Sequence, residues 1–159
     1  VQEMGGKIDI ANQESHYGED TADLRIRSSE LKGITIQPEE VPNLIDELPL
    51  IALLASQADG ETVVRGAEEL RVKESDRINS IVSNMSAWGA KIFERPDGFS
   101  IEGPTVLSGG DAKSFDDHRI AMTMVVAGLI SKTPVKLDNP ACMDISHPGF
   151  VQELIALCN

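Results

Sequence analysis

Met85-Ser-Ala-Trp-Gly-Ala-Lys-Ile92 repeats the pattern of Val1-Gln-Glu-Met-Gly-Gly-Lys-Ile8, which lies 84 residues earlier in the chain. The pattern is typical of the last turn of a helix, a glycine that ends it and the first residues of a strand. A helix precedes the second copy, since apolar residues recur at helical spacing from Lys73 to Trp88. Because the first copy begins inside such a helix, we expect the 159 residues to be part of a longer protein.

A second correspondence follows each motif, at an offset of 71 residues. It aligns 46–55 with 117–126, and it continues from 62–64 onto 133–135. In both copies a nearly all-apolar stretch of helical length is followed by a short strand-like run. We therefore expect repeat copies at about 1–71 and 72–143, followed by a final helix at about 146–158.

Each copy alternates helices and strands, which predicts helices packed against mostly parallel and mixed sheets. The two apolar helices are expected to be buried inside the sheets and the two amphipathic ones to lie further out. A polar, hairpin-like segment is expected at 12–23, and a tight turn at Pro96-Asp-Gly98. The expected strands are 7–11, 24–27, 33–36, 61–65, 91–94, 99–102, 105–107 and 134–137, and the expected helices are 47–57, 75–88, 118–131 and 148–158.

The composition excludes several classes of protein. With 26 acidic and 14 basic residues the net charge is −12, which repels the phosphate backbone of nucleic acids. A hydrophobic content of 41% is too high for a disordered acidic tail, and no apolar run approaches the roughly 20 residues of a membrane span. Neither nucleic acid nor a membrane is expected as a partner. The two cysteines are expected to be free thiols in a cytoplasmic protein, and no metal-binding motif occurs.

Charged residues gather where three of these helices begin. Asp46-Glu47 precedes Pro49, Lys73-Glu-Ser-Asp-Arg77 opens the next helix, and Asp116-Asp-His-Arg119 opens a third. Acidic residues there can be helix caps, and this purely structural role is one interpretation of Asp46, Glu74, Asp76 and Asp117.

The basic residues at the same places need another explanation. Lys73, Arg77, His118 and Arg119 lie where the helix dipole disfavours cations, unless an anion binds there. Arg71 is expected to approach the same place from the strand side. This arrangement predicts a phosphate or carboxylate site, in which neighbouring carboxylates such as Asp46 and Glu74 can transfer protons.

Three motifs carry a resemblance to a known family. Arg71-Val-Lys-Glu-Ser-Asp-Arg-Ile78, Asp116-Asp-His-Arg-Ile-Ala-Met122 and Asn43-Leu-Ile-Asp-Glu-Leu-Pro49 resemble segments of the 5-enolpyruvylshikimate-3-phosphate synthase (EPSP synthase) family, in the same order. The resemblance implies an α+β fold with α/β-type repeats: repeated βαβαββ units whose helices pack against mixed four-stranded sheets, as in enolpyruvyl transferases. It also implies that residues 1–159 are part of the C-terminal domain of a two-domain synthase, starting inside one repeat, and that the N-terminal domain is the partner.

By the same resemblance, the reaction transfers the enolpyruvyl group of phosphoenolpyruvate to the 5-hydroxyl of shikimate-3-phosphate, without a metal or organic cofactor. Asp46 and Glu74 would transfer protons, Lys73 would help to bind shikimate-3-phosphate, and the remaining cations would hold phosphoenolpyruvate. Those cations are Arg77, His118 and Arg119. The fragment alone is expected to be inactive.

Two positions depart from the family pattern. Some members carry a lysine before the last helix, whereas this chain has Met143-Asp-Ile-Ser-His-Pro148, where His147 is either a substitute or a residue at the helix entry. Glu69 stands where many members have a polar amide, so we do not expect a substrate contact there. The alternatives are a stand-alone anion-binding module without catalysis, a purely structural domain, or the related UDP-N-acetylglucosamine enolpyruvyl transferase, which lacks the Lys-Glu-Ser-Asp-Arg pattern.

Overall fold

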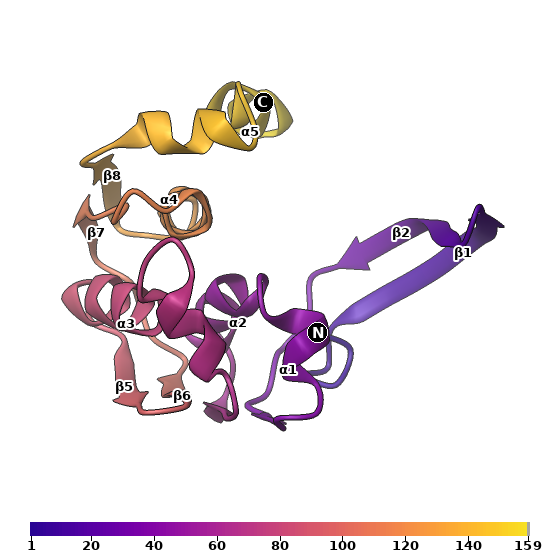
Figure 1. Ribbon diagram of the computed structural model, residues 1–159, viewed down its shortest axis with the longest axis horizontal. Coiled ribbons are helices and arrows are strands. Elements are labelled where there is room, and N and C mark those ends of the chain that lie inside the picture. Colours follow the sequence, from indigo (N-terminus) through magenta and orange to yellow (C-terminus); the bar gives the residue numbers. More distant parts are fainter. Residues whose placement is uncertain (159) are drawn as a thin grey trace.

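Helices and strands alternate along the chain in the computed structural model, which describes residues 1–158 (Figure 1). No helix in this part of the chain is long and apolar enough to cross a membrane. The strands are β1 (Lys7–His16), β2 (Glu19–Arg27), β3 (Thr35–Ile36), β4 (Gly60–Val64), β5 (Lys91–Arg95), β6 (Gly98–Gly103), β7 (Gly109–Ala112) and β8 (Thr133–Leu137). The helices are α1 (Val41–Leu44), α2 (Leu48–Ala55), α3 (Arg77–Ala87), α4 (His118–Gly128) and α5 (Phe150–Leu157), with 3₁₀ turns η1 (Glu68–Val72) and η2 (Pro140–Ile145).

A mixed sheet of four strands, in the order β3-β4-β6-β5, contains strands from both of the expected repeat copies. β3 and β4 of the first copy are parallel, while the β5–β6 hairpin of the second copy adds to β4 in antiparallel fashion. α2 and α3 pack against this sheet and against α4, and the core between them includes Trp88, Phe99 and Ile101. This sheet confirms the expected fold class.

The repeat is visible in backbone geometry as well as in sequence. Gly5 and Gly89 both have positive φ, +91° and +90°. The following amide in each copy donates to a carbonyl five residues back, Gly6 to Val1 at 3.1 Å and Ala90 to Met85 at 2.9 Å. This is the Schellman motif that ends a helix on a left-handed glycine, as the paired Gly-containing motifs predict.

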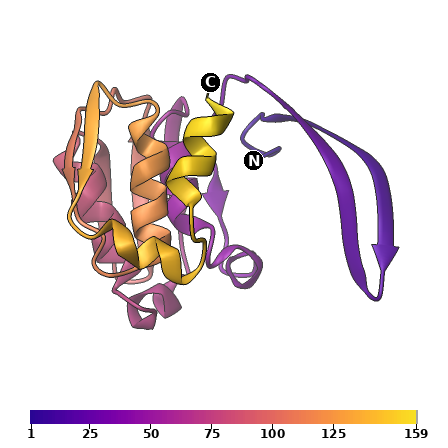
Figure 2. The same cartoon turned by 90° about the horizontal axis from the view of Figure 1, so that it is seen from above.

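The internal helices are buried as expected. Six of the eight residues of α2 are buried, and the buried residues of α4 include Ile120 and Met124. α3 buries one face, and none of the residues of α5 is buried. Figure 1 shows α5, in yellow, at one edge of the molecule, and Figure 2 shows it beside α4.

Several boundaries differ from the sequence-based expectation. The strand expected at 105–107 is wrong: these residues lie outside the strands, and Thr105 N donates to Ser56 O in the turn after α2, at 2.7 Å. The real strand is β7, which pairs in parallel with β8 and begins at two glycines. A Cβ on Gly109 would lie 2.2 Å from Thr133 O, so this close approach requires a residue that strand propensity disfavours. The helix expected from residue 75 begins at Arg77, and Lys73 and Glu74 precede it.

The β1–β2 hairpin extends away from the rest of the molecule (Figures 1 and 2). The polar segment 12–23 forms its outer half, with the turn at Tyr17 and Gly18. Both turn residues have positive φ, which is typical of a two-residue hairpin loop. The hairpin expectation is therefore confirmed, and both strands are longer than predicted.

The same cross-strand pairs occur in β1–β2 and in β5–β6, but their burial differs. Ile8 pairs with Ile26 as Ile92 pairs with Ile101. Ile26 is 69% exposed, whereas Ile101 is fully buried beneath the helices. The apolar face of the β1–β2 hairpin is therefore exposed, whereas helices cover the corresponding face of the β5–β6 hairpin.

We expect the backbone amides of β1 to exchange with solvent much faster than those of β5. A two-stranded hairpin without a packed face is marginally stable in water, so it opens without global unfolding. Hydrogen exchange followed by NMR measures both strands in one sample. Equal protection of Lys7–Ala11 and Lys91–Arg95 would contradict this expectation.

Candidate active site

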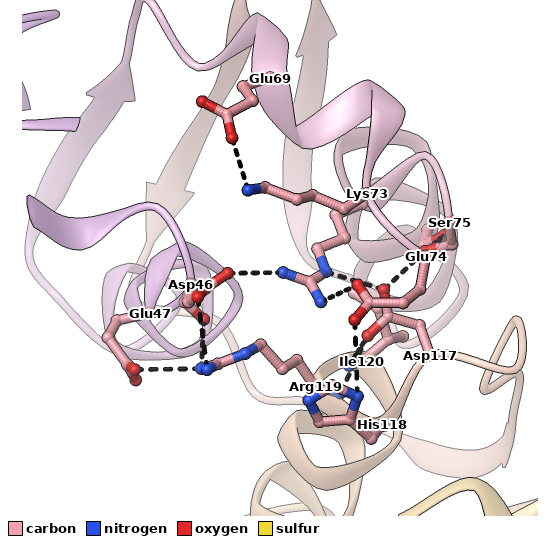
Figure 3. A network of polar contacts seen from close by, with 12 residues as sticks. Asp46, Glu47, Glu69, Lys73, Glu74, Ser75, Asp117, His118, Arg119 and Ile120 are labelled. Carbon is pink, nitrogen blue, oxygen red and sulfur yellow. Dashed lines mark hydrogen bonds and ion pairs between the residues drawn. The ribbon is translucent and has the colours of Figure 1, made fainter. Parts of the chain in front are cut away.

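Three helix starts that are far apart in the sequence meet in one polar cluster (Figure 3). Asp46 and Glu47 precede α2, Glu74 and Arg77 stand at the start of α3, and the third group opens α4. That third group consists of Asp117, His118 and Arg119. The structure therefore brings together five of the six residues predicted from sequence, with Lys73 at the margin.

Arg77 lies at the centre of the cluster and is only 1% exposed. Its Nε donates to Asp117 Oδ2 at 2.7 Å, its Nη1 to Asp46 Oδ1 at 2.9 Å, and its Nη2 to Glu74 Oε2. Burial opposes the charge, but the hydrogen bonds and charges of these carboxylates outweigh it and raise the pKa of Arg77 above its ordinary value. A single guanidinium thus fixes three carboxylates from three segments.

Asp117 is fully buried and serves two purposes at once. Its Oδ1 caps α4 by accepting from the backbone N of Arg119 at 2.9 Å and of Ile120 at 3.4 Å. Its Oδ2 accepts from Arg77 and from Ser75 Oγ, the latter at 3.1 Å. Burial alone would raise the pKa of Asp117, but the bonds and charge of Arg77 lower it below the ordinary value.

The capping interpretation holds for only part of the acidic set. Asp76 caps α3 by accepting from Asn79 N at 3.0 Å, and Asp117 caps α4. The carboxylate of Asp46 instead contacts Arg77 and Arg119, and that of Glu74 contacts Arg77 and His118. Asp46 and Glu74 are therefore held by cations on the accessible side of the cluster, where they can exchange protons with a ligand.

Arg119 is the more accessible of the two arginines. Its Nη1 donates to the backbone O of Asp46 and to Glu47 Oε1, both at 3.1 Å, and its Nη2 lies 3.4 Å from Asp46 Oδ2. His118 Nδ1 lies 4.0 Å from Glu74 Oε1. A cavity of about 210 Å³ adjoins Asp46, Glu47 and Arg119, with apolar walls from α2, α4 and Phe150.

Lys73 and Arg71 lie outside this network. Lys73 Nζ pairs with Glu69 Oε1 at 2.6 Å, beside the cluster in Figure 3. Arg71 approaches the start of α3 from the strand side, since its guanidinium contacts Asp76, Glu94 and two backbone carbonyls, but it does not join the Arg77 cluster.

His147 makes its side-chain contacts within the start of α5. Its Nε2 lies 3.0 Å from Glu153 Oε2, and its ring packs edge-on against Phe150 at the start of α5. These contacts favour the helix-entry interpretation. Sequence reasoning missed Glu47 as a partner of Arg119, although its position next to Asp46 at a helix start is the signal that could have found it.

A group of three or more His, Cys, Asp or Glu arranged to hold a metal ion does not occur within residues 1–158. The arrangement instead combines cations that can bind an anion with two accessible carboxylates that can move protons.

The model of the EPSP synthase (3-phosphoshikimate 1-carboxyvinyltransferase) family matches residues 1–154. The chain belongs to this family. It is 45% identical over 157 residues to the 3-phosphoshikimate 1-carboxyvinyltransferase of Alkaliphilus metalliredigens, a match that covers 99% of the chain and 37% of the relative. The enzyme of the same name from Oceanobacillus iheyensis is 47% identical over 97% of the chain and 36% of its own length. The chain thus spans little more than a third of the EPSP synthases it matches.

Solved structures agree with the assignment to this family. EPSP synthase from Acinetobacter baumannii superposes with a TM-score of 0.92 at 36% identity, over 98% of this chain and 37% of that one. The enolpyruvyl transferase NikO from Streptomyces tendae, at 20% identity and a TM-score of 0.68, shares the fold. The EPSP synthase relatives do not favour the UDP-N-acetylglucosamine alternative.

Replacing Asp117 by Asn should destabilise the protein by about 3 kcal/mol at pH 7, since it leaves the buried charge of Arg77 without its main counter-ion. Because the folded-state pKa of Asp117 is depressed, its contribution is complete above the unfolded value of about 3.9 and is lost as pH falls through the folded value. The unfolding free energies of the unchanged protein and of Asp117→Asn should therefore become equal only in strong acid. Urea unfolding across this pH range measures the difference.

The exposed Asp111→Asn is the control for the same chemical change, and it should leave the unfolding free energy nearly unaltered. An Asp117→Asn protein as stable as this control at pH 7 would show that the buried pair is not what joins α3 to α4.

Proposed function

We propose that this chain forms one wall of the active site of an EPSP synthase. That enzyme would transfer the enolpyruvyl group of phosphoenolpyruvate to the 5-hydroxyl of shikimate-3-phosphate. The observation that carries the proposal is the cluster in which Arg77 and Arg119 hold Asp46 and Glu74 at the starts of three helices. Fixed cations at an anion site, combined with accessible carboxylates, suit a reaction that binds phosphate and moves protons.

In the proposed reaction the 5-hydroxyl oxygen bonds to C2 of phosphoenolpyruvate while C3 gains a proton. The tetrahedral intermediate then loses phosphate from C2 and a proton from C3, which gives the enol ether. Asp46 would take the hydroxyl proton and hold shikimate-3-phosphate, and Glu74 would deliver and remove the proton at C3. Both carboxylates are about half exposed, so a ligand can reach them.

The cations would bind the two substrates. Arg119 and His118 would contact the phosphate and carboxylate of phosphoenolpyruvate from the start of α4, and Lys73 would help to bind shikimate-3-phosphate. Arg77 would attract the bound anion by its charge from a buried position, because its three nitrogens already bond to Asp46, Glu74 and Asp117. No metal or organic cofactor is part of the proposal.

We place residues 1–159 in the C-terminal domain of a two-domain synthase, with repeat copies at about 1–71 and 72–143 and a final helix at about 146–158. The matching turns at Gly5 and Gly89 support the division into two repeat copies. The chain covers 37% of its relative, which supports its assignment to part of one domain. The N-terminal domain would supply the opposite wall. A cytoplasmic location completes the proposal, in keeping with the free thiols of Cys142 and Cys158.

A chimera tests the function directly. The chain replaces the corresponding segment of the Alkaliphilus metalliredigens relative, and phosphate release from phosphoenolpyruvate and shikimate-3-phosphate is measured. We expect turnover by the chimera and none by the 159-residue chain, because misplacing reactants by about 1 Å already costs on the order of 100-fold. Asp46→Asn and Glu74→Gln should each lower kcat of the chimera by at least about 100-fold, as general acid–base catalysts do.

Asp111→Asn in the same chimera is the control and should leave kcat unchanged. A folded chimera, verified by its thermal transition, that is inactive would contradict the proposal. Full activity after Asp46→Asn and Glu74→Gln would remove these residues from the mechanism, and turnover by the chain alone would show that the site is not shared.

A further inference from the structure

Glu47 and Arg119 form an ion pair at the accessible edge of the cluster. Glu47 directly follows Asp46 and precedes α2, and its Oε1 accepts from Arg119 Nη1 at 3.1 Å. Figure 3 shows Arg119 extending from α4 to the space between Asp46 and Glu47. The Glu47 side chain is 56% exposed and that of Arg119 is 33% exposed, so water and small ions reach this pair.

The cluster holds more negative than positive charge. Four carboxylates surround the two guanidiniums of Arg77 and Arg119. An incoming anion therefore competes with carboxylates that already bond to each guanidinium. An anion gains the full charge of an arginine only when one of these carboxylates releases it.

Burial and bonding identify which carboxylate can move. Asp117 is fully buried and bonded to two backbone amides, so it cannot leave. Glu74 is held by the buried Arg77, and Asp46 bridges both arginines. Glu47 has Arg119 as its one charged partner among residues 1–158, and it is the most exposed of the four.

We infer that Glu47 is a displaceable counter-ion of Arg119. In the free protein it holds the guanidinium at the edge of the site, and a bound phosphate or carboxylate takes its place on Arg119. Glu47 thereby lowers the affinity of the site for anions. This inference rests on the proposed function, because it assumes that Arg119 belongs to the anion site.

The test is a titration of the unchanged chain and of Glu47→Gln with inorganic phosphate at pH 7 and low salt, followed by NMR. The readouts are the backbone amides of 74–77 and 118–120 and the Nε proton of Arg119. Glutamine keeps the shape and the acceptor oxygen of the side chain but removes the competing charge. We expect the dissociation constant for phosphate to fall by about three- to tenfold, as for a charge a few ångströms away near a screened surface.

Glu102→Gln is the matched control, because Glu102 is 57% exposed and pairs with Lys91 at 3.2 Å. It lies next to Gly103, whose backbone approaches the far end of α2. The variant removes the same charge from the protein and should leave phosphate affinity unchanged. Arg119→Ala should abolish the response, whereas Lys132→Ala should not.

Unchanged affinity in Glu47→Gln would overturn the inference, and weaker binding would show that Glu47 orients Arg119 instead. An equal gain in Glu102→Gln would assign the effect to net charge and would also overturn it. If the unchanged chain shows no phosphate response at these amides, the anion site fails and the inference fails with it. If the unchanged chain binds phosphate at these amides but Glu47→Gln binds it no more tightly, the inference fails and the proposed function remains intact.

Discussion

A buried guanidinium must be neutralised where it lies, and this requirement at Arg77 organises the whole site. The three carboxylates that meet it come from before α2, from the start of α3 and from the cap of α4, and they lie up to 40 residues from Arg77 in sequence. Ion pairs of this kind add little net stability compared with apolar packing, but breaking one is costly. The packing of α2, α3 and α4 therefore requires one arrangement of charges. This arrangement also fixes the positions of the candidate catalytic carboxylates.

The same interaction explains why cations stand at helix starts, where the helix dipole disfavours them. Sequence reasoning accounted for Arg77 and Arg119 by an absent anion, and the structure shows that the protein's own carboxylates provide a negative partner in the free state. The two accounts are compatible, since a ligand anion would exchange with the accessible carboxylates and leave the buried Arg77–Asp117 pair in place. Asp76 and Asp117 cap helices, whereas Asp46 and Glu74 are turned to the accessible side.

Much of the fold could be predicted because the repeat fixes it locally. Gly5 closes a turn and Gly89 ends α3 by a backbone conformation that glycine favours, and alternating apolar residues set the registers of both hairpins. β7 was missed because it begins at Gly109 and Gly110, where a close approach to β8 overrides strand propensity. The site was predicted through motif residues, but side-chain partners depend on tertiary contacts. For that reason the bond of Arg71 to Glu94 and the bond between Glu47 and Arg119 were not foreseen.

Proton exchange at the Nε of Arg77 tests this junction most directly. The proton is bonded to Asp117 in a site closed to water, so it should exchange with solvent far more slowly than the Nε proton of Arg27, whose side chain is 57% exposed. Side-chain ¹⁵N NMR of the unchanged chain at pH 7 measures both. A slowly exchanging Arg77 resonance that persists when phosphate is added is the result expected, and exchange as fast as that of Arg27 would contradict the buried junction.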